Sequence, residues 1–161
     1  MSLDKGKISK FDATPYKFAI VAARYNSSMV DAMIDDISKV FAENGVKKKS
    51  IKIVRVPGAA ELPVICSLLA KSLNYDAIIA LGVVIKGETS HDEIITQSTA
   101  HALQTIAVET TVPVINGIIA AKNNEQALSR TSGKIARGVE FAEAALEMAW
   151  KSALLLEELE S

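Results

Sequence analysis

The residues of this chain that are best suited to chemistry stand together in the segment Gly-Glu-Thr-Ser-His, which ends at His91. Imidazole exchanges protons near neutral pH without help, so His91 is a candidate acid–base group. Ser90, with Glu93 three residues later, has the form of a capping box and predicts that a helix starts here. The free N–H groups of a helix start bind anions, and Thr89 adds a hydroxyl beside them. The segment therefore suggests acid–base chemistry on a small phosphorylated molecule.

Each of these residues also has an ordinary structural explanation. The run Gly-Glu-Thr-Ser lacks the lysine of a P-loop and is a weak signal by itself. The acidic residues Glu88, Asp92 and Glu93 favour the helix dipole, and they oppose a bound phosphate unless a cation is recruited. A single histidine in a first helical turn is more often polar surface than a catalyst. The assignment therefore depends on what else reaches the same place.

Four short apolar runs alternate with helical patterns, and they would hold the histidine segment at one edge of a sheet. The runs predict strands at 18–23, 51–56, 77–85 and 112–120. The stretches between and after them predict helices that begin at Ser27 or Ser28, at 59–63, near His91, at 123–126 and at 134–138. This alternation predicts an α/β fold, a three-layer sandwich with helices on both faces of a four-stranded parallel sheet.

Length and composition restrict the classes of protein to which the chain can belong. The 161 residues are most simply one domain, with 17–161 as its body and 1–16 as an N-terminal arm, either a loose tail or an edge strand on a neighbour's sheet. A net charge of −1 gives no electrostatic reason to expect a nucleic-acid partner.

The chain starts without an apolar signal region, and no apolar run reaches the roughly 20 residues that cross a bilayer. The single Cys66 fits a reducing compartment, so we expect a cytoplasmic protein without a membrane partner.

Several cofactor classes are not expected from the sequence. Neither G-x-G-x-x-G nor a P-loop follows the first predicted strand, where nucleotide binding would be recognised. His91 and His101 are about 80° apart around a helix, and no His-Glu-x-x-His motif is present, so no metal is expected. The hydrophobic share of 49% is large for a small domain and suggests that part of it is buried between subunits.

Polar residues follow each of the first three predicted strands, at the edge where parallel sheets bind their ligands. Tyr25 and Asn26 follow the first strand, Glu61 follows the second and His91 follows the third. Tyr25 is suited to stack on a flat heterocycle, and Glu61 to accept hydrogen bonds from sugar-like hydroxyls. Taken alone, Tyr25 is equally well explained as a rim hydrophobe, and Glu61 is better explained as a first-turn acid.

Three further polar residues lie later in the chain. Arg130 and Lys134, near the end of the short helix, are by themselves best explained as cations at a helix C-terminus. Arg130 is also suited to the bidentate phosphate contact that the acidic segment lacks. Asn116 lies about four residues before the end of its strand, roughly 13 Å from the sheet edge, so it is too far to serve the edge of its own subunit.

With these motifs in combination, the chain resembles the 6,7-dimethyl-8-ribityllumazine synthase family from about Phe18 to Ala149. The motifs are Arg-Tyr-Asn, Val-Pro-Gly-Ala-Ala-Glu, Ala-Leu-Gly-Val-Val-Ile-Lys-Gly-Glu-Thr-Ser-His and Pro-Val-Ile-Asn-Gly-Ile. The resemblance implies a flavodoxin-like strand order and a transferase that needs no cofactor. The implied reaction condenses 5-amino-6-(D-ribitylamino)uracil with 3,4-dihydroxy-2-butanone 4-phosphate, and its products are the lumazine, phosphate and water. This is the penultimate step of riboflavin biosynthesis.

The resemblance also implies roles for individual residues. The pyrimidine and its ribityl chain would be bound by Tyr25, Asn26, Ala59, Ala60, Glu61, Val83, Val84, Ile85, Asn116 and Lys134. The phosphate would be bound by Glu88 (through its backbone), Thr89 and Arg130, and His91 would carry protons. Asn116 and Arg130 would come from the neighbouring subunit, so that the active site is shared between two chains.

Two departures from the family qualify these expectations. Family members often have Phe where Asn116 stands and an aromatic residue where Ala60 stands, so stacking on the heterocycle is reduced. The segment 133–138 is shorter than the turn typical of sixty-subunit shells, which favours a homopentamer. The resemblance also suggests riboflavin synthase as a partner. The alternatives are an archaeal-type riboflavin synthase, which would use two lumazine molecules, and a non-catalytic flavin-binding pentameric scaffold.

Overall fold

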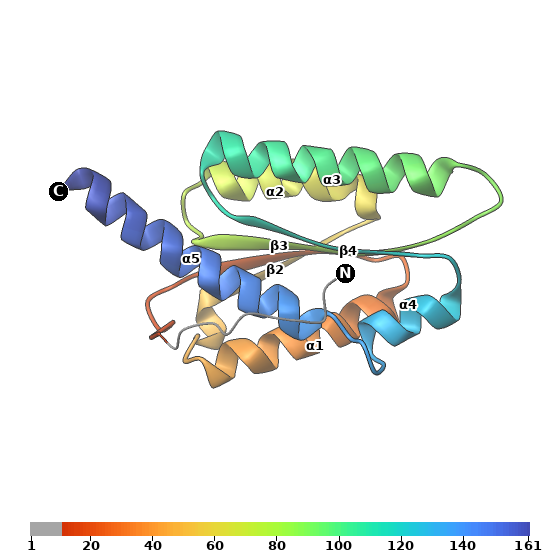
Figure 1. Cartoon of the computed structure of the whole chain (residues 1–161), viewed down its shortest axis with the longest axis horizontal. Helices are drawn as coiled ribbons and strands as arrows, with labels where there is room; N and C mark the ends of the chain where they lie inside the picture. The colour runs from red at the N-terminus through yellow and green to blue at the C-terminus, as the bar shows by residue number, and fades with distance from the viewer. Residues whose placement is uncertain (1–10) are drawn as a thin grey trace.

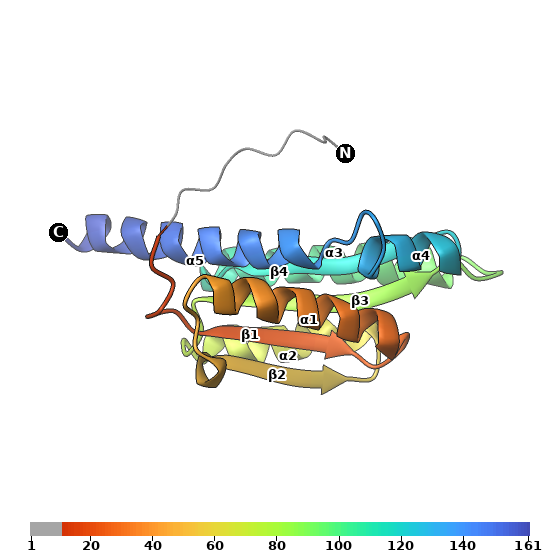
Figure 2. The same ribbon diagram turned by 90° about the horizontal axis from the view of Figure 1, so that it is seen from below.

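Four runs of small and branched apolar residues form the sheet in the computed structural model, which describes residues 11–161. The strands are β1 (Phe18–Ala23), β2 (Ile51–Val56), β3 (Ala77–Ile85) and β4 (Val114–Ala121). All pair in parallel, in the order β2-β1-β3-β4 (Figure 2). The two inner strands, β1 and β3, are covered on both faces, which is why their sequences read as unbroken apolar runs rather than as alternating patterns.

Helices cover both faces of this sheet (Figure 1). On one face lie α1 (Ser27–Glu43), α4 (Asn124–Thr131) and α5 (Gly138–Glu160), and on the other lie α2 (Leu62–Lys71) and α3 (His91–Thr110). Short 3-10 helices, η1 (Lys48–Ser50) and η2 (Ala59–Glu61), flank β2. The expected three-layer α/β sandwich with a flavodoxin-like order is confirmed.

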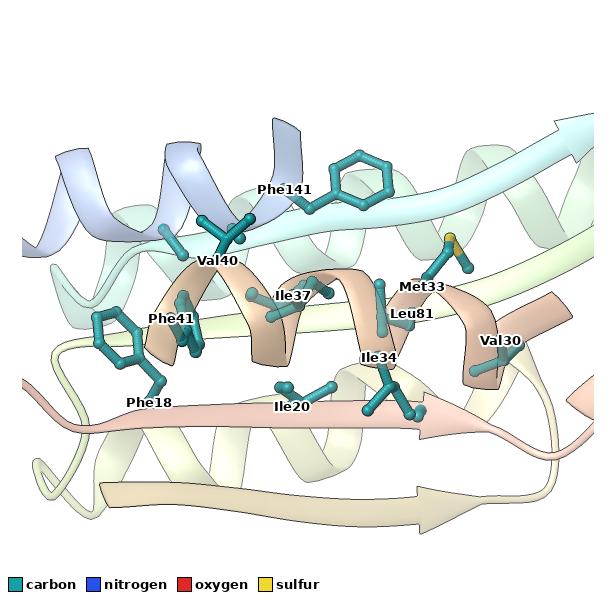
Figure 3. Close-up of a cluster of buried hydrophobic side chains, with 14 of the residues drawn as sticks. Phe18, Ile20, Val30, Met33, Ile34, Ile37, Val40, Phe41, Leu81 and Phe141 are labelled. Atoms are coloured by element: carbon teal, nitrogen blue, oxygen red, sulfur yellow. The ribbon is translucent and has the colours of Figure 1, made fainter. Parts of the chain in front are cut away.

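The larger part of the core lies between the sheet and the helices α1 and α5 (Figure 3). Phe18 of β1 packs on Phe41 of α1 with ring centroids 4.4 Å apart. Glycines allow the layers to approach closely, because a Cβ at Gly117 would lie 2.6 Å from Leu81 Cδ2 and one at Gly138 would lie 2.6 Å from a side-chain atom of α1. The sheet therefore packs closely against α1 and α5.

The opposite face has its own cluster, in which Leu62 of α2 and Leu103 of α3 pack on Ile78 and other residues of the sheet. Cys66 of α2 is fully buried here, and burial raises the pKa of its thiol to about 12. The thiol is therefore neutral and inert near pH 7. Thr99 of α3 is also buried, and its hydroxyl donates to the carbonyl oxygen of Ala59 at 3.5 Å, which ties α3 to the loop that follows β2.

Strand bounds were predicted better than helix caps. The first three strands have the expected limits, and β4 begins two residues later than expected, after Pro113, which has no N–H to give to the sheet. The expected caps by Ser27 or Ser28 are wrong, because α1 follows Asn26 and has no side-chain cap. Ser90 does precede α3, but the expected capping box is wrong, because Glu93 pairs instead with Lys86, Oε1 to Nζ 3.8 Å.

The described part of the N-terminal arm lies against the chain's own last helix. Phe11 stacks on Trp150 of α5 with ring centroids 5.2 Å apart, and Ala13 is fully buried. Residues 1–10 of the expected arm lie outside the described residues, so its pairing with a neighbour's sheet stays a prediction. Among residues 11–161, no helix has the length and apolar character required to cross a bilayer.

Candidate active site

An open pocket of about 500 Å³ lies beyond the carboxyl ends of β1, β2 and β3, at the end of the sheet from which the β3–α3 loop extends (Figure 1). This is the edge at which the sequence placed its polar residues. Ten of the predicted site residues line it: Tyr25, Asn26, Ala59, Ala60, Glu61, Val83, Val84, Ile85, Thr89 and His91. Three loops that are distant in sequence therefore meet in one cavity.

At the loop after β2, the Tyr25 ring and the Glu61 carboxylate both lie close to Gly58 and line the pocket. The Tyr25 ring lies over Gly58, where a Cβ would come within 3.0 Å of Tyr25 Cδ2. The Gly58 N–H donates to Glu61 Oε2 at 2.8 Å, which leaves other lone pairs of this exposed carboxylate for a ligand. Tyr25 is 71% exposed, so a face of its ring is open to a planar ligand.

Asn26 connects two of the loops. Its backbone adopts the left-handed conformation with φ 55°, which asparagine tolerates better than most residues. Its side-chain Nδ2 donates to the carbonyl oxygen of Val83 at 2.9 Å. The amide that was expected to bind substrate thus also holds the end of β1 against β3, and no sequence pattern indicated this pairing.

The turn between β3 and α3 forms the polar end of the pocket. Thr89 and His91 both line it and are exposed, and the backbone N–H of His91 donates to Thr89 Oγ1 at 3.5 Å. Asp92, at the second position of α3, also lines the pocket and accepts a hydrogen bond from the Gly87 N–H at 3.3 Å. The imidazole is therefore beside a turn that carries both backbone donors and a carboxylate.

Four predicted site residues do not line this pocket of a single chain. Glu88 lies in the turn, between two lining residues. Asn116 is exposed on the edge strand β4, and its Oδ1 accepts from the Ile118 N–H at 3.1 Å. Arg130, in α4, donates from Nη1 to the Gln126 carbonyl oxygen at 3.3 Å, and Lys134 follows α4 as an exposed residue. That Asn116 serves a neighbouring subunit stays a prediction.

The structure adds five lining residues to those predicted: Ala23, Gly58, Gly87, Asp92 and Ile95. The glycines could be found from sequence, since each occurs in a turn that follows a strand. Asp92 had a signal too, but its place in the first turn of a helix was explained by the helix dipole alone. Ala23 ends β1 and Ile95 lies in α3. Whether either side chain faces the cavity depends on how its strand or helix is oriented, which residue spacing does not determine.

The Asp, Glu, Lys and Arg side chains that line the pocket are all acidic. Its walls contain the carboxylates of Glu61 and Asp92 and no lysine or arginine. Lys86, the nearest cation along the chain, is exposed and paired with Glu93. In residues 11–161, no group of three or more His, Cys, Asp and Glu side chains is arranged to hold a metal ion. The pocket of one chain therefore offers a phosphate no lysine or arginine side chain.

Fold and pocket together define an α/β protein that binds a small molecule at the carboxyl edge of a parallel sheet. A sequence model of the 6,7-dimethyl-8-ribityllumazine synthase family matches residues 15–152. The chain therefore belongs to the 6,7-dimethyl-8-ribityllumazine synthase family.

Individual relatives match over most of the chain, and each bears the name 6,7-dimethyl-8-ribityllumazine synthase. The protein from Polaromonas sp. is 38% identical over 146 residues, which is 91% of this chain and 93% of the relative. That of Desulfotalea psychrophila is 40% identical, covering 83% of this chain and 86% of the relative. That of Thermococcus onnurineus is 39% identical, covering 87% and 91%.

Proposed function

We propose that this chain is a transferase that condenses 5-amino-6-(D-ribitylamino)uracil with 3,4-dihydroxy-2-butanone 4-phosphate. The products are 6,7-dimethyl-8-ribityllumazine, phosphate and water, as the penultimate step of riboflavin biosynthesis. The observation that carries the proposal is the single pocket in which Tyr25, Glu61 and the Thr89–His91 turn meet, in a chain of the lumazine synthase family.

The pyrimidine occupies the end of the pocket beside the loop after β2. Its ring stacks on the exposed face of Tyr25, and its ribityl hydroxyls donate to the free lone pairs of Glu61. The backbone at Ala59 and Ala60 contacts the same chain of hydroxyls. The uracil edge meets the backbone at the end of β3, from Val83 through Val84 to Ile85, which is kept in place by Asn26.

The phosphorylated ketone occupies the end of the pocket beside α3. Its phosphate accepts hydrogen bonds from the Thr89 hydroxyl and from backbone N–H groups around Glu88 at the helix start. Since the walls carry no cation, Arg130 of the neighbouring subunit supplies the bidentate contact, and Lys134 assists substrate binding. Asn116 of the neighbour, on its exposed edge strand, approaches the heterocycle.

The chemistry needs positioning and proton transfer rather than a covalent enzyme intermediate. The amine of the pyrimidine attacks the ketone carbon directly, so no lysine Schiff base is required. Holding the two substrates together makes the step effectively unimolecular. His91 then moves protons during imine formation, phosphate loss and ring closure. No cofactor takes part.

A homopentamer with shared active sites follows from the same reasoning, and we propose that the protein works as one in the cytoplasm. Large apolar side chains exposed on the outer helices support an assembly: Val64 and Leu68 of α2, and Ile94 and Val108 of α3. The short segment 133–138 supports the pentamer over a sixty-subunit shell. Riboflavin synthase is the partner that would take up the product.

Mixing the two substrates with the protein tests the function. We expect lumazine absorbance to appear together with one equivalent of released phosphate. An archaeal-type riboflavin synthase would consume lumazine and release no phosphate, and a flavin-binding scaffold would bind ligand without turnover. Either result would overturn the proposal. Light scattering of the same sample measures the size of the assembly.

A further inference from the structure

The carboxylate of Asp92 lies in the pocket, beside the turn that follows β3. Asp92 is half-buried, lines the cavity beside Thr89 and His91, and accepts the Gly87 N–H at 3.3 Å. That N–H belongs to the turn that binds the phosphate in the proposed function. One of the turn's donors is therefore already paired with an anion that the chain itself provides.

The neighbouring acidic residue on the same helical turn behaves differently. Glu93 does not line the pocket, is exposed, and pairs with Lys86 outside it. Glu88 is likewise exposed and does not line the pocket. Of the three acids around the turn, Asp92 is the one whose charge faces the cavity, where no lysine or arginine of the same chain offsets it.

We propose that Asp92 is a specificity-determining residue of the phosphate end of the pocket, an internal anion that competes with phosphate for the turn. When the phosphorylated substrate binds, its phosphate takes over the Gly87 N–H and the Asp92 carboxylate must move aside. When inorganic phosphate is formed, the carboxylate returns to the N–H and opposes its retention. Asp92 thus weakens binding of the product phosphate. It weakens binding of the phosphorylated substrate by a smaller factor, because the substrate has further contacts in the pocket. This inference rests on the proposed function.

Asp92→Asn tests the charge, because the amide keeps the shape and can still accept the Gly87 N–H. Glu93→Gln is the matched control, since it removes the same charge one residue away but outside the pocket. The measurement is the dissociation constant of inorganic phosphate, by calorimetry on the assembled protein, with its inhibition constant in the lumazine assay. For D92N we expect phosphate to bind about three- to tenfold more tightly, from loss of like-charge repulsion at close range. For E93Q we expect a change below about twofold, because exposed charges are well screened.

Salt separates a charge effect from a change in structure. Raising the ionic strength from about 0.15 M to 1 M shortens the screening length from about 8 Å to 3 Å, so the advantage of D92N should shrink. An unchanged phosphate affinity in D92N, an equal gain in E93Q, or a gain that ignores salt would each overturn the inference. Calorimetry with phosphate needs no turnover. If the wild-type protein makes no lumazine, the proposed function fails while the comparison of variants still decides the role of Asp92.

Discussion

His91 is the histidine that lines the pocket, and imidazole is the side-chain type most often used in general acid–base catalysis. General acid–base catalysis is typically worth about 10²–10⁴-fold, and we expect His91→Ala to lower kcat within that range. KM for both substrates should change little, since Tyr25, Glu61 and the turn remain. Steady-state kinetics measure this, and His101→Ala is the control, because this exposed histidine of α3 lies outside the pocket. A normal kcat in H91A would remove His91 from the mechanism.

Gly58 sets how closely the Tyr25 ring can lie over the loop after β2. A Cβ at this position would stand 3.0 Å from Tyr25 Cδ2 and 3.3 Å from Glu61 Oε2, so Gly58→Ala must displace the ring. A displaced rotamer costs about 0.5–1.5 kcal/mol, and we expect KM for the pyrimidine to rise about two- to tenfold. The comparison is Gly82→Ala, whose Cβ would make an ordinary 3.5 Å contact with Ala59 Cβ. Equal pyrimidine KM values in the two variants would contradict this role.

Residue types were easier to predict than residue pairings. Aromatic, carboxylate and histidine side chains after successive strands could be assigned to one edge, because parallel strands end together. That Asn26 donates to Val83, and that Asp92 accepts from Gly87, depends on side-chain directions that spacing does not determine. Arg130 and Lys134 do not line this chain's pocket, and the spacing of residues along one chain gives no position relative to a neighbouring chain.

Gly117 allows β4 to pack closely against β3 and α5. A Cβ at Gly117 would lie 2.6 Å from Leu81 Cδ2 and 2.9 Å from the Ala80 carbonyl oxygen, which is backbone and cannot move freely. Overpacking of this kind costs about 1–3 kcal/mol, so Gly117→Ala should lower the free energy of unfolding by that amount. Urea unfolding measures it. Gly87→Ala, whose Cβ meets nothing within 4 Å, should stay within about 0.5 kcal/mol of the wild type.

Strands were predictable from sequence because their limits follow from composition. β1, β2 and β3 are mainly apolar runs that end at charged, Pro-Gly or Lys-Gly positions, and the central two, β1 and β3, are buried on both faces. Helix caps were less predictable, because a side chain that could cap a helix can instead bond to a residue elsewhere in the fold. Asn26 and Glu93 had local capping roles available, yet one bonds β3 and the other pairs with Lys86.

At the scale of the whole molecule, one chain has a pocket with two carboxylates and no cation, while Arg130 lies in α4 outside it. In the proposed head-to-tail ring of identical subunits, α4 of one chain would meet the pocket of the next without any change of fold. If that arrangement holds, His91 and Arg130 of each working site come from different chains. Two inactive variants should then complement each other.

His91→Ala and Arg130→Ala, each nearly inactive alone, should regain activity when co-expressed or refolded together. A site is intact only where the pocket comes from an R130A chain and the arginine comes from an H91A neighbour, so random mixing restores about one quarter of the sites. Mixing either variant with the double variant His91→Ala/Arg130→Ala is the control, because no intact pair can form there. Activity that stays at the sum of the two single variants, in a mixture shown by mass spectrometry to contain hybrid oligomers, would mean that Arg130 serves its own chain or none.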